Sequence, residues 1–321
     1  MLGTHSVTCR VVPMGTDNPP LKHHYIPRFL LAQWALNDGR LWRMLRPVPG
    51  KIATKCVAPA EIGYEAGLYS LPGLPAAEAQ QVERHFMSPL DAMAADAHRM
   101  LLEGRVERMP QRERSAWSRF IMSLWFRTPD TLRDFKDAFA IALLAGDDGL
   151  ERRFAEIRRD GQPEKLADMI AAMGPEFAEH AAMDLIRKMS DDPDNGLRLN
   201  NMHWSVIAAD GGREFLISDA ALQHSSDGVF TRSGWITIPI APRHLFVAVS
   251  DPAVGATIRR LRRNDLVSRN NRAVVRRASI FVGASDLSQL RFVERHFGQE
   301  EHRTIVRGVA ERYRTQMAEG E

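Results

Sequence analysis

Residues 203–218, HWSVIAADGGREFLIS, decide the fold class, because their apolar spacing differs from that of the chain before them. Two short runs rich in β-branched and aromatic residues, 203–208 and 214–218, flank Asp210-Gly211-Gly212. Such runs around a glycine turn predict a β-hairpin. The chain before Gly196 has helical spacing instead, so the change in period predicts an α+β fold with an antiparallel C-terminal region.

The middle of the chain, about residues 78–190, is predicted to be a helical bundle. Its apolar residues recur at steps of three and four, which places them on one face of a helix. Pro89 interrupts the first of these stripes, so it either kinks that helix or starts a new one with Ser88 as its N-cap. The stripes cover 82–100, 117–125 and 132–143, and weaker helical patterns follow at 166–173 and 177–189 before a turn at 191–196.

Strand-like runs are expected on both sides of this bundle. Near the N-terminus, Tyr25–Leu31 and Leu41–Leu45 flank Asn37-Asp38-Gly39, which predicts a hairpin. The stretch Pro47–Pro75 is rich in proline and glycine and indicates loops around short elements. The C-terminal expectations are strands at 235–240, 244–249 and 279–282 and a basic helix at 265–277.

Length and composition indicate one folded domain. The chain has 321 residues, is 44% hydrophobic and carries a net charge of +3, which excludes disorder and a disulfide scaffold. We expect a flexible leader at 1–21, one α+β domain at 22–290 and a helical tail at 291–321. The chain has no secretory leader pattern, no apolar run of 18 residues and two distant cysteines, so a cytoplasmic protein without a membrane span is expected.

The opening of that domain resembles a known family. The sequence HHYIPRFLL at 23–31 is similar to the start of the domain of unknown function 4238 family of bacterial proteins. Matching landmarks follow at Val82-Glu83, Arg127-Thr128-Pro129, Ser218-Asp219, Ile238–Pro242 and Asn270, so the resemblance covers roughly 22–285. Two departures are Ala220-Ala221, where the family has Asn-Pro, and Ala241, where it has Ser. The resemblance implies a fold, and it implies no activity.

The adjacent His23 and His24 are the first candidate site residues. Histidine serves as a general base near neutral pH or as a metal ligand. Neighbouring residues on a strand point to opposite faces, so at most one of the two faces a given pocket. The alternative is a histidine whose hydrogen bonds hold the N-terminal strand in place.

Arg127 and Asp219 are further candidates, because both lie at the ends of expected elements. Arg127 either caps the end of its helix or clamps a phosphate or carboxylate. Asp219 either ligates a metal or orients a histidine, or it caps the following turn. The histidine spacings predict no metal motif, so a divalent metal stays open as a cofactor without an assigned site.

A run of arginines late in the chain is the strongest charge feature. The guanidinium group suits phosphate contact, and clustering concentrates the positive field beyond the net charge. The alternative is a solvated helix face paired with acidic residues of the middle region. The candidate phosphate-binding residues are Arg259, Arg260, Arg262, Arg263, Arg272 and Arg276, and Arg269 and Arg277 belong to the same run.

Two function classes follow from these residues. One is a hydrolase acting on a phosphodiester or nucleotide, with His24 as base or ligand, Arg127 as anion clamp and Asp219 as ligand or orienting acid. The other is a non-catalytic protein that binds a nucleic acid or an acidic partner through the stretch Arg259–Arg277. No phosphate-binding glycine loop and no G-x-S-x-G motif is present to favour a particular enzyme.

Overall fold

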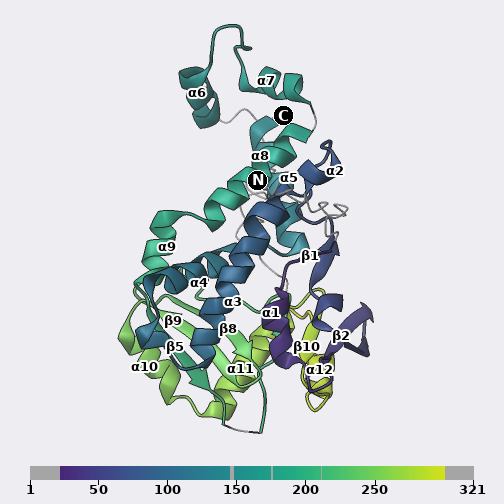
Figure 1. Ribbon diagram of the computed structural model, residues 1–321, viewed down its shortest axis with the longest axis vertical. Coiled ribbons are helices and arrows are strands. Elements are labelled where there is room, and N and C mark those ends of the chain that lie inside the picture. The colour runs from purple at the N-terminus through teal and green to yellow at the C-terminus, as the bar shows by residue number, and fades with distance from the viewer. Residues whose placement is uncertain (1–21, 145–147, 175, 211, 301–321) are drawn as a thin grey trace, which may run out of the picture.

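The computed structural model describes residues 22–144, 148–174, 176–210 and 212–300. Over these residues the fold is mixed α+β, with N-terminal antiparallel strands, central helices and a C-terminal antiparallel sheet (Figure 1). The expected leader and residues 301–321 of the expected tail lie outside the described residues. No helix in the described ranges is long and apolar enough to span a membrane.

The strands form three small antiparallel sheets. The first pairs β1 (Lys22–His24) with β4 (Tyr64–Ala66). The second has the order β3-β2-β10-β6, and the third has the order β5-β9-β8-β7. The strands of the second sheet are β2 (Leu41–Val48), β3 (Lys51–Val57), β6 (Ile217–Ser218) and β10 (Val282–Ala284), and those of the third are β5 (His203–Ala208), β7 (Gln223–His224), β8 (Trp235–Ala241) and β9 (His244–Val249).

Helices fill the middle of the chain and return near its end. The short α1 (Arg28–Leu31) and α2 (Ala76–Ala79) precede the bundle, with 3₁₀ turns at Ala32–Trp34, Pro59–Glu61 and Val106–Arg108. The central helices are α3 (Ser88–Leu102), α4 (Gln111–Leu124), α5 (Pro129–Leu144), α6 (Asp148–Ile157), α7 (Leu166–Met173), α8 (Glu176–Ser190) and α9 (Pro193–Asn200). The later ones are α10 (Pro252–Arg260), α11 (Arg263–Arg277) and α12 (Leu290–His296).

The third sheet is covered on both faces. Phe246 and Ala248 of β9 join the core of the helical bundle, whereas the alternate residues Leu245, Val247 and Val249 pack with α10 and α11. This follows from the two-residue period of a strand, which sends successive side chains to opposite faces. The sheet therefore holds α10 and α11 on the side away from the bundle. In Figure 1 these two helices lie at the end of the molecule opposite α6 and α7.

The N-terminal hairpin prediction is wrong. A turn does form at Gly39, which has a positive φ of 75°, but Arg28–Leu31 before it is helical. Pro27 has a fixed φ of −61° and lacks an N–H, so it suits the start of a helix. β2 pairs instead with β3, across the turn at Gly50, so the expected loop region holds a strand.

The hairpin predicted at 203–218 is also wrong. β5 pairs with β9, and β6 pairs with β10 in a different sheet. Phe215, Leu216 and Ile217 each enter a different apolar cluster as the chain crosses between the two sheets. Their burial explains the apolar run that resembled a second hairpin strand. The expected strand at 279–282 is likewise shifted, since β10 begins at Val282.

The helical predictions are largely confirmed, with two differences. Pro89 lies in the first turn of α3, which begins at Ser88 directly after a π-turn over Glu83–Met87, so a new α-helix does start there. Ser88 is not its N-cap, because Met87 holds that position and Ser88 is itself helical. The turn expected at 191–196 is the start of α9, with Asp192 accepting a hydrogen bond from the Asn195 N–H as its N-cap. The basic helix is present as α11.

Candidate functional site

His23 lies at the start of a buried polar cluster. Its side chain is 0% exposed, and its Nδ1 accepts a hydrogen bond of 2.9 Å from the Tyr69 N–H. Nε2 therefore donates to Gln80 Oε1, and the two hydrogen bonds fix the orientation of the ring. Both nitrogens are engaged, so His23 holds β1 against the loop at Tyr69.

His24 points to the opposite face of β1, as the strand period predicts. Burial, with smaller effects from Arg28 and Lys22, lowers the pKa of His24 to about 4. Its Nε2 has no hydrogen-bond partner within the described part of the chain. A ring with so low a pKa is a weak base at neutral pH, which weakens the base role predicted for it.

Arg127 is 0% exposed and lies in the link between α4 and α5. Its Nη2 forms an ion pair with Asp91 Oδ1 at 2.7 Å. The Tyr69 hydroxyl donates to the Arg127 carbonyl at 3.3 Å. Arg127 therefore neither caps the end of α4 with its side chain nor reaches solvent, and its partner is a carboxylate from α3.

Two carboxylates interact electrostatically with this arginine, and Asp91 is the one in contact with it. Burial raises the pKa of Asp91, against the lowering effect of Arg127. Burial also raises the pKa of Glu83, although a hydrogen bond from the Ser88 hydroxyl acts in the other direction. We call His23, Tyr69, Gln80, Glu83, Asp91 and Arg127 the Arg127 cluster. Perturbed carboxyl groups beside a buried cation are typical both of functional sites and of structural ion pairs.

Asp219 belongs to a second network. Its carboxylate accepts backbone hydrogen bonds from Ser279, Ile280 and Phe281 at 2.9 to 3.1 Å, and a fourth from the Ser279 hydroxyl. Burial raises the pKa of Asp219, and these donors lower it in part. All its partners lie about sixty residues away, so Asp219 anchors a distant loop and does not cap its own turn.

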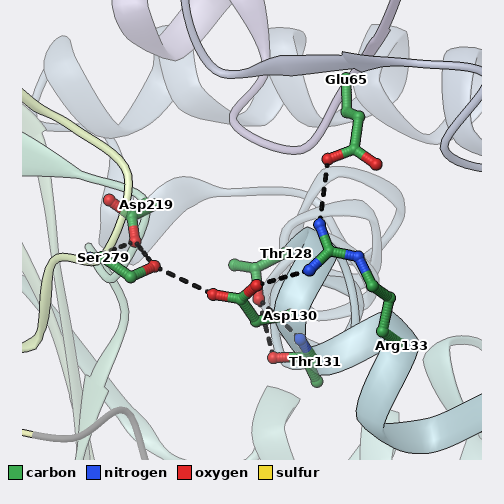
Figure 2. Close-up of polar contacts among 7 residues, drawn as sticks. All are labelled: Glu65, Thr128, Asp130, Thr131, Arg133, Asp219 and Ser279. Carbon is green, nitrogen blue, oxygen red and sulfur yellow. Dashed lines mark hydrogen bonds and ion pairs between the residues drawn. The ribbon is translucent and has the colours of Figure 1, made fainter. Parts of the chain in front are cut away.

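Figure 2 shows how this network continues to the N-terminal strands. The Ser279 hydroxyl also lies 3.2 Å from Asp130 Oδ2, and Asp130 Oδ1 binds Arg133 at 2.9 Å. Arg133 in turn reaches Glu65 of β4 at 3.3 Å. Thr128 caps α5 through the Thr131 N–H. The chain of contacts ties β4, α5 and the loop before β10 together.

The structure thus brings some of the predicted residues together and separates others. His23 and Arg127 share one cluster through Tyr69, and Asp219 lies in the neighbouring network, while His24 faces elsewhere. Among the described residues, no group of three or more His, Cys, Asp or Glu side chains could hold a metal ion. The catalytic roles of these four residues stay predictions.

Several members of the cluster were missed in the sequence. Asp91 had a usable signal, since it precedes Ala94, His98 and Leu101 at steps of three, four and three on the buried face of α3. An acid on an apolar helical face indicates a buried partner. Tyr69, Gln80 and Ser279 lie in loops or at element ends, where no periodicity marks them.

The arginines of α10 and α11 behave differently. Arg259, Arg260, Arg262, Arg269 and Arg272 are exposed, and Arg263 is half-buried. Within the described ranges none of these six forms an ion pair with an acid, and Arg263 donates only to the Arg259 carbonyl. We call these six residues the arginine surface.

Two arginines of the predicted run lie outside this surface. Arg276 and Arg277 both contact Glu300, at 3.0 and 3.5 Å, and Arg277 also donates to Gln223. The phosphate-binding role predicted for Arg276 is therefore weakened by an existing acid partner. For the six others, the expected pairing with acidic residues of the helical middle is not seen in the part of the chain that the structure describes.

One comparison with known proteins gives a match. A family model described as protein of unknown function (DUF4238) matches residues 22–288. No curated protein and no solved structure matches the chain.

Proposed function

The chain belongs to the DUF4238 family of proteins of unknown function, and we propose that it is a non-catalytic protein whose arginine surface binds nucleic acid. The family has no known activity, so the proposal is argued from the surface of this chain. One observation carries this proposal: six arginines close in sequence have no acidic partner among the described residues. Like charges held together without compensation repel one another and gain most from an external anion.

The positions of these arginines add support. Arg262 is the N-cap of α11 and Arg263 begins the helix, at the end where the helix dipole is positive. Cations are unfavourable at that end, whereas phosphate groups are favourable there. The two arginines therefore lower the stability of α11 in the free protein and favour the binding of an anionic ligand at its N-terminus.

The spacing of the residues suits a polymer more than a single phosphate. Arg262, Arg269 and Arg272 recur at helical spacing along one side of α11, over about 15 Å at 1.5 Å per residue. The stretch contains no aromatic residue on which a base could stack. Contact with phosphates along a backbone is therefore favoured over stacking on single-stranded bases.

Fluorescence anisotropy with labelled duplex DNA, duplex RNA and single-stranded DNA tests the proposal. We expect duplex binding that weakens steeply with salt. The triple variant Arg262→Gln, Arg269→Gln, Arg272→Gln should show a shallower salt dependence, because the slope falls by about 0.9 for each phosphate that the protein no longer neutralises.

A matched control removes the same charge elsewhere. Arg99, Arg105 and Arg187 are exposed and each is paired with an acid, so their triple replacement by Gln should leave binding near that of the wild type. Absence of salt-dependent binding in the wild type, or equal weakening in both triple variants, would count against a specific arginine surface.

A further inference from the structure

The outer edge of the second sheet is open. β3 is the end strand of the order β3-β2-β10-β6, so it pairs with β2 on one side and with no strand of the described residues on the other. Lys51, Ala53, Thr54 and Lys55 are exposed along it. The β2–β3 hairpin lies at the margin of the molecule in Figure 1. An exposed strand edge presents N–H and C=O groups that can bind the main chain of an added strand.

Three cations lie on one face of this hairpin. Successive side chains of a strand point to opposite faces, so Lys51, Ala53 and Lys55 share one face of β3. The strand register places Arg43 of β2 directly opposite Lys55. Like charges in directly opposite positions destabilise a sheet. This face of the hairpin therefore gains from a carboxylate placed beside it.

The hairpin supplies no such carboxylate itself. Residues 39–60 contain five cations and no acid. Arg40 and Arg46 donate to backbone carbonyls, whereas the three cations of the shared face form no ion pair within the described ranges. Glu61, which follows the hairpin, accepts a hydrogen bond from the Ala58 N–H at 2.8 Å. The positive charge of this face is therefore available to a partner.

We propose that the outer edge of β3 binds an extended acidic segment of a partner protein as an added strand. Main-chain hydrogen bonds to the edge supply affinity, and carboxylates beside Lys51 and Lys55 supply specificity. The same lysines oppose pairing with a second copy of β3, which carries the same charges. A nucleic acid offers phosphates to the cations but no main chain that matches a strand edge, so a peptide fits both features.

The strand period also sets the spacing of the acids in the partner. Lys51 and Lys55 are four residues apart, which is about 13 Å along a strand at roughly 3.3 Å per residue. An added strand has the same rise and the same alternation of faces. Two carboxylates that reach both lysines must therefore also be four residues apart, whereas acids three residues apart point to opposite faces.

Fluorescence anisotropy with labelled heptapeptides tests this proposal. Thr-Glu-Val-Thr-Val-Glu-Thr has the required spacing, and Thr-Glu-Val-Val-Glu-Thr-Thr has the same composition and charge with its acids three residues apart. We expect the first peptide to bind about fivefold more tightly, which corresponds to one cross-strand ion pair at the upper end of its usual range.

Methylation of the peptide amides tests the main-chain hydrogen bonds separately from the charge. Only alternate N–H groups of an added strand face the edge that it joins. Two versions of the first peptide are needed, one methylated at its second, fourth and sixth amides and the other at its third and fifth. One version should lose binding and the other should retain it.

Variants of the protein locate the site. The double variant Lys51→Gln, Lys55→Gln should lose the preference for the first peptide, and the control Lys165→Gln, Lys188→Gln, which changes two other exposed lysines, should keep it. No peptide binding, equal affinity for both spacings or equal effects of the two methylation patterns overturns the proposal. So does a double variant that weakens duplex DNA binding and not peptide binding. The arginine surface shares no residue with this edge, so the two proposals can fail independently.

Discussion

At the scale of single residues, the polar interior is organised by carboxylates that serve distant segments. Asp219 is the clearest case, with four donors from Ser279–Phe281 on its two oxygens. An amide in its place has a single acceptor oxygen and turns an N–H group toward N–H donors. The role of this residue in stability is therefore larger than its position at a short strand suggests.

We predict that Asp219→Asn lowers the free energy of unfolding by about 3 kcal/mol, since hydrogen bonds to charged groups contribute roughly 1.5–3 kcal/mol each. Urea denaturation of the variant and of the wild type measures this difference in the free energy of unfolding. Asp38→Asn is the control, because Asp38 is exposed and accepts one local bond from the Arg40 N–H. Equal stability of the two variants would contradict the anchoring role.

His98 gives a pH dependence. Burial lowers its pKa to about 4, and its Nε2 contacts the Ile240 carbonyl at 2.7 Å. Between pH 4 and the unfolded pKa of about 6.5, His98 binds a proton in the unfolded chain but not in the folded one. The folded state is therefore destabilised by protonation: the contribution of neutral His98 to the free energy of unfolding is complete above about pH 6.5 and is lost as the pH falls toward 4.

The matched variant is His98→Gln, which keeps a donor and does not titrate. Between pH 7 and pH 4 its unfolding free energy should fall less than that of the wild type, by up to about 3 kcal/mol. Parallel pH profiles of the two proteins in urea denaturation would show that His98 is not the titrating group.

At the scale of elements, Arg262 is a residue whose binding role and structural role conflict. It occupies the N-cap of α11 in an extended conformation and makes no capping hydrogen bond. Serine at an N-cap accepts from the first free N–H groups and stabilises a helix by about 1 kcal/mol. Its replacement also removes a cation from the positive end of the helix dipole.

We therefore predict that Arg262→Ser raises the free energy of unfolding by about 1 kcal/mol while weakening nucleic-acid binding. Arg269→Ser, in the interior of the same helix, should weaken binding without any gain in stability. Thermal denaturation and anisotropy on both variants separate these effects. A loss of stability in Arg262→Ser would refute the capping argument.

The positions of helices and strands were easier to predict from the sequence than the pairing of the strands. The helical stripes and the strands β8 and β9 follow from local periodicity, because every apolar step is visible within one element. The pairing of β5 with β9 and of β6 with β10 depends on segments far apart in sequence. Phe215, Leu216 and Ile217 are all apolar because each packs into a different apolar cluster where the chain crosses between two sheets. In the sequence, such a run of apolar residues looks the same as a strand of a hairpin.

The candidate site was predictable only in part, for a similar reason. His23, Arg127 and Asp219 were found from residue type and position, and all three are buried in polar networks. Their partners are set by tertiary contacts, such as Tyr69 with His23 and Ser279 with Asp219. Whether one of these residues is structural or catalytic depends on its partners, and the spacing of residues in the sequence does not identify them.

At the scale of the whole molecule, one apolar core connects the N-terminal, central and C-terminal regions. It includes Tyr25, Phe120 and Phe281, and the tryptophans Trp34, Trp117 and Trp204. Such continuity supports the proposal that residues 22–290 form a single domain. Residues of the central helices and of the third sheet belong to the same apolar cluster where they meet, within the described part of the chain.

A single domain predicts a single cooperative unfolding transition. Far-ultraviolet circular dichroism follows the helices, and tryptophan fluorescence follows the shared core, so the two denaturation curves should coincide. A helical signal that persists after the fluorescence change would indicate an independently folding bundle and contradict the proposal.

The position of β10 also bears on synthesis at the ribosome. Residues 282–284 pair with β2 on one side and β6 on the other, so the second sheet lacks its inner strand until the end of the family region has been made. At typical translation rates the β2–β3 hairpin waits on the order of tens of seconds with an open edge. An unpaired strand edge can pair with another chain, so the risk of association during synthesis ends only when the last segment closes the fold.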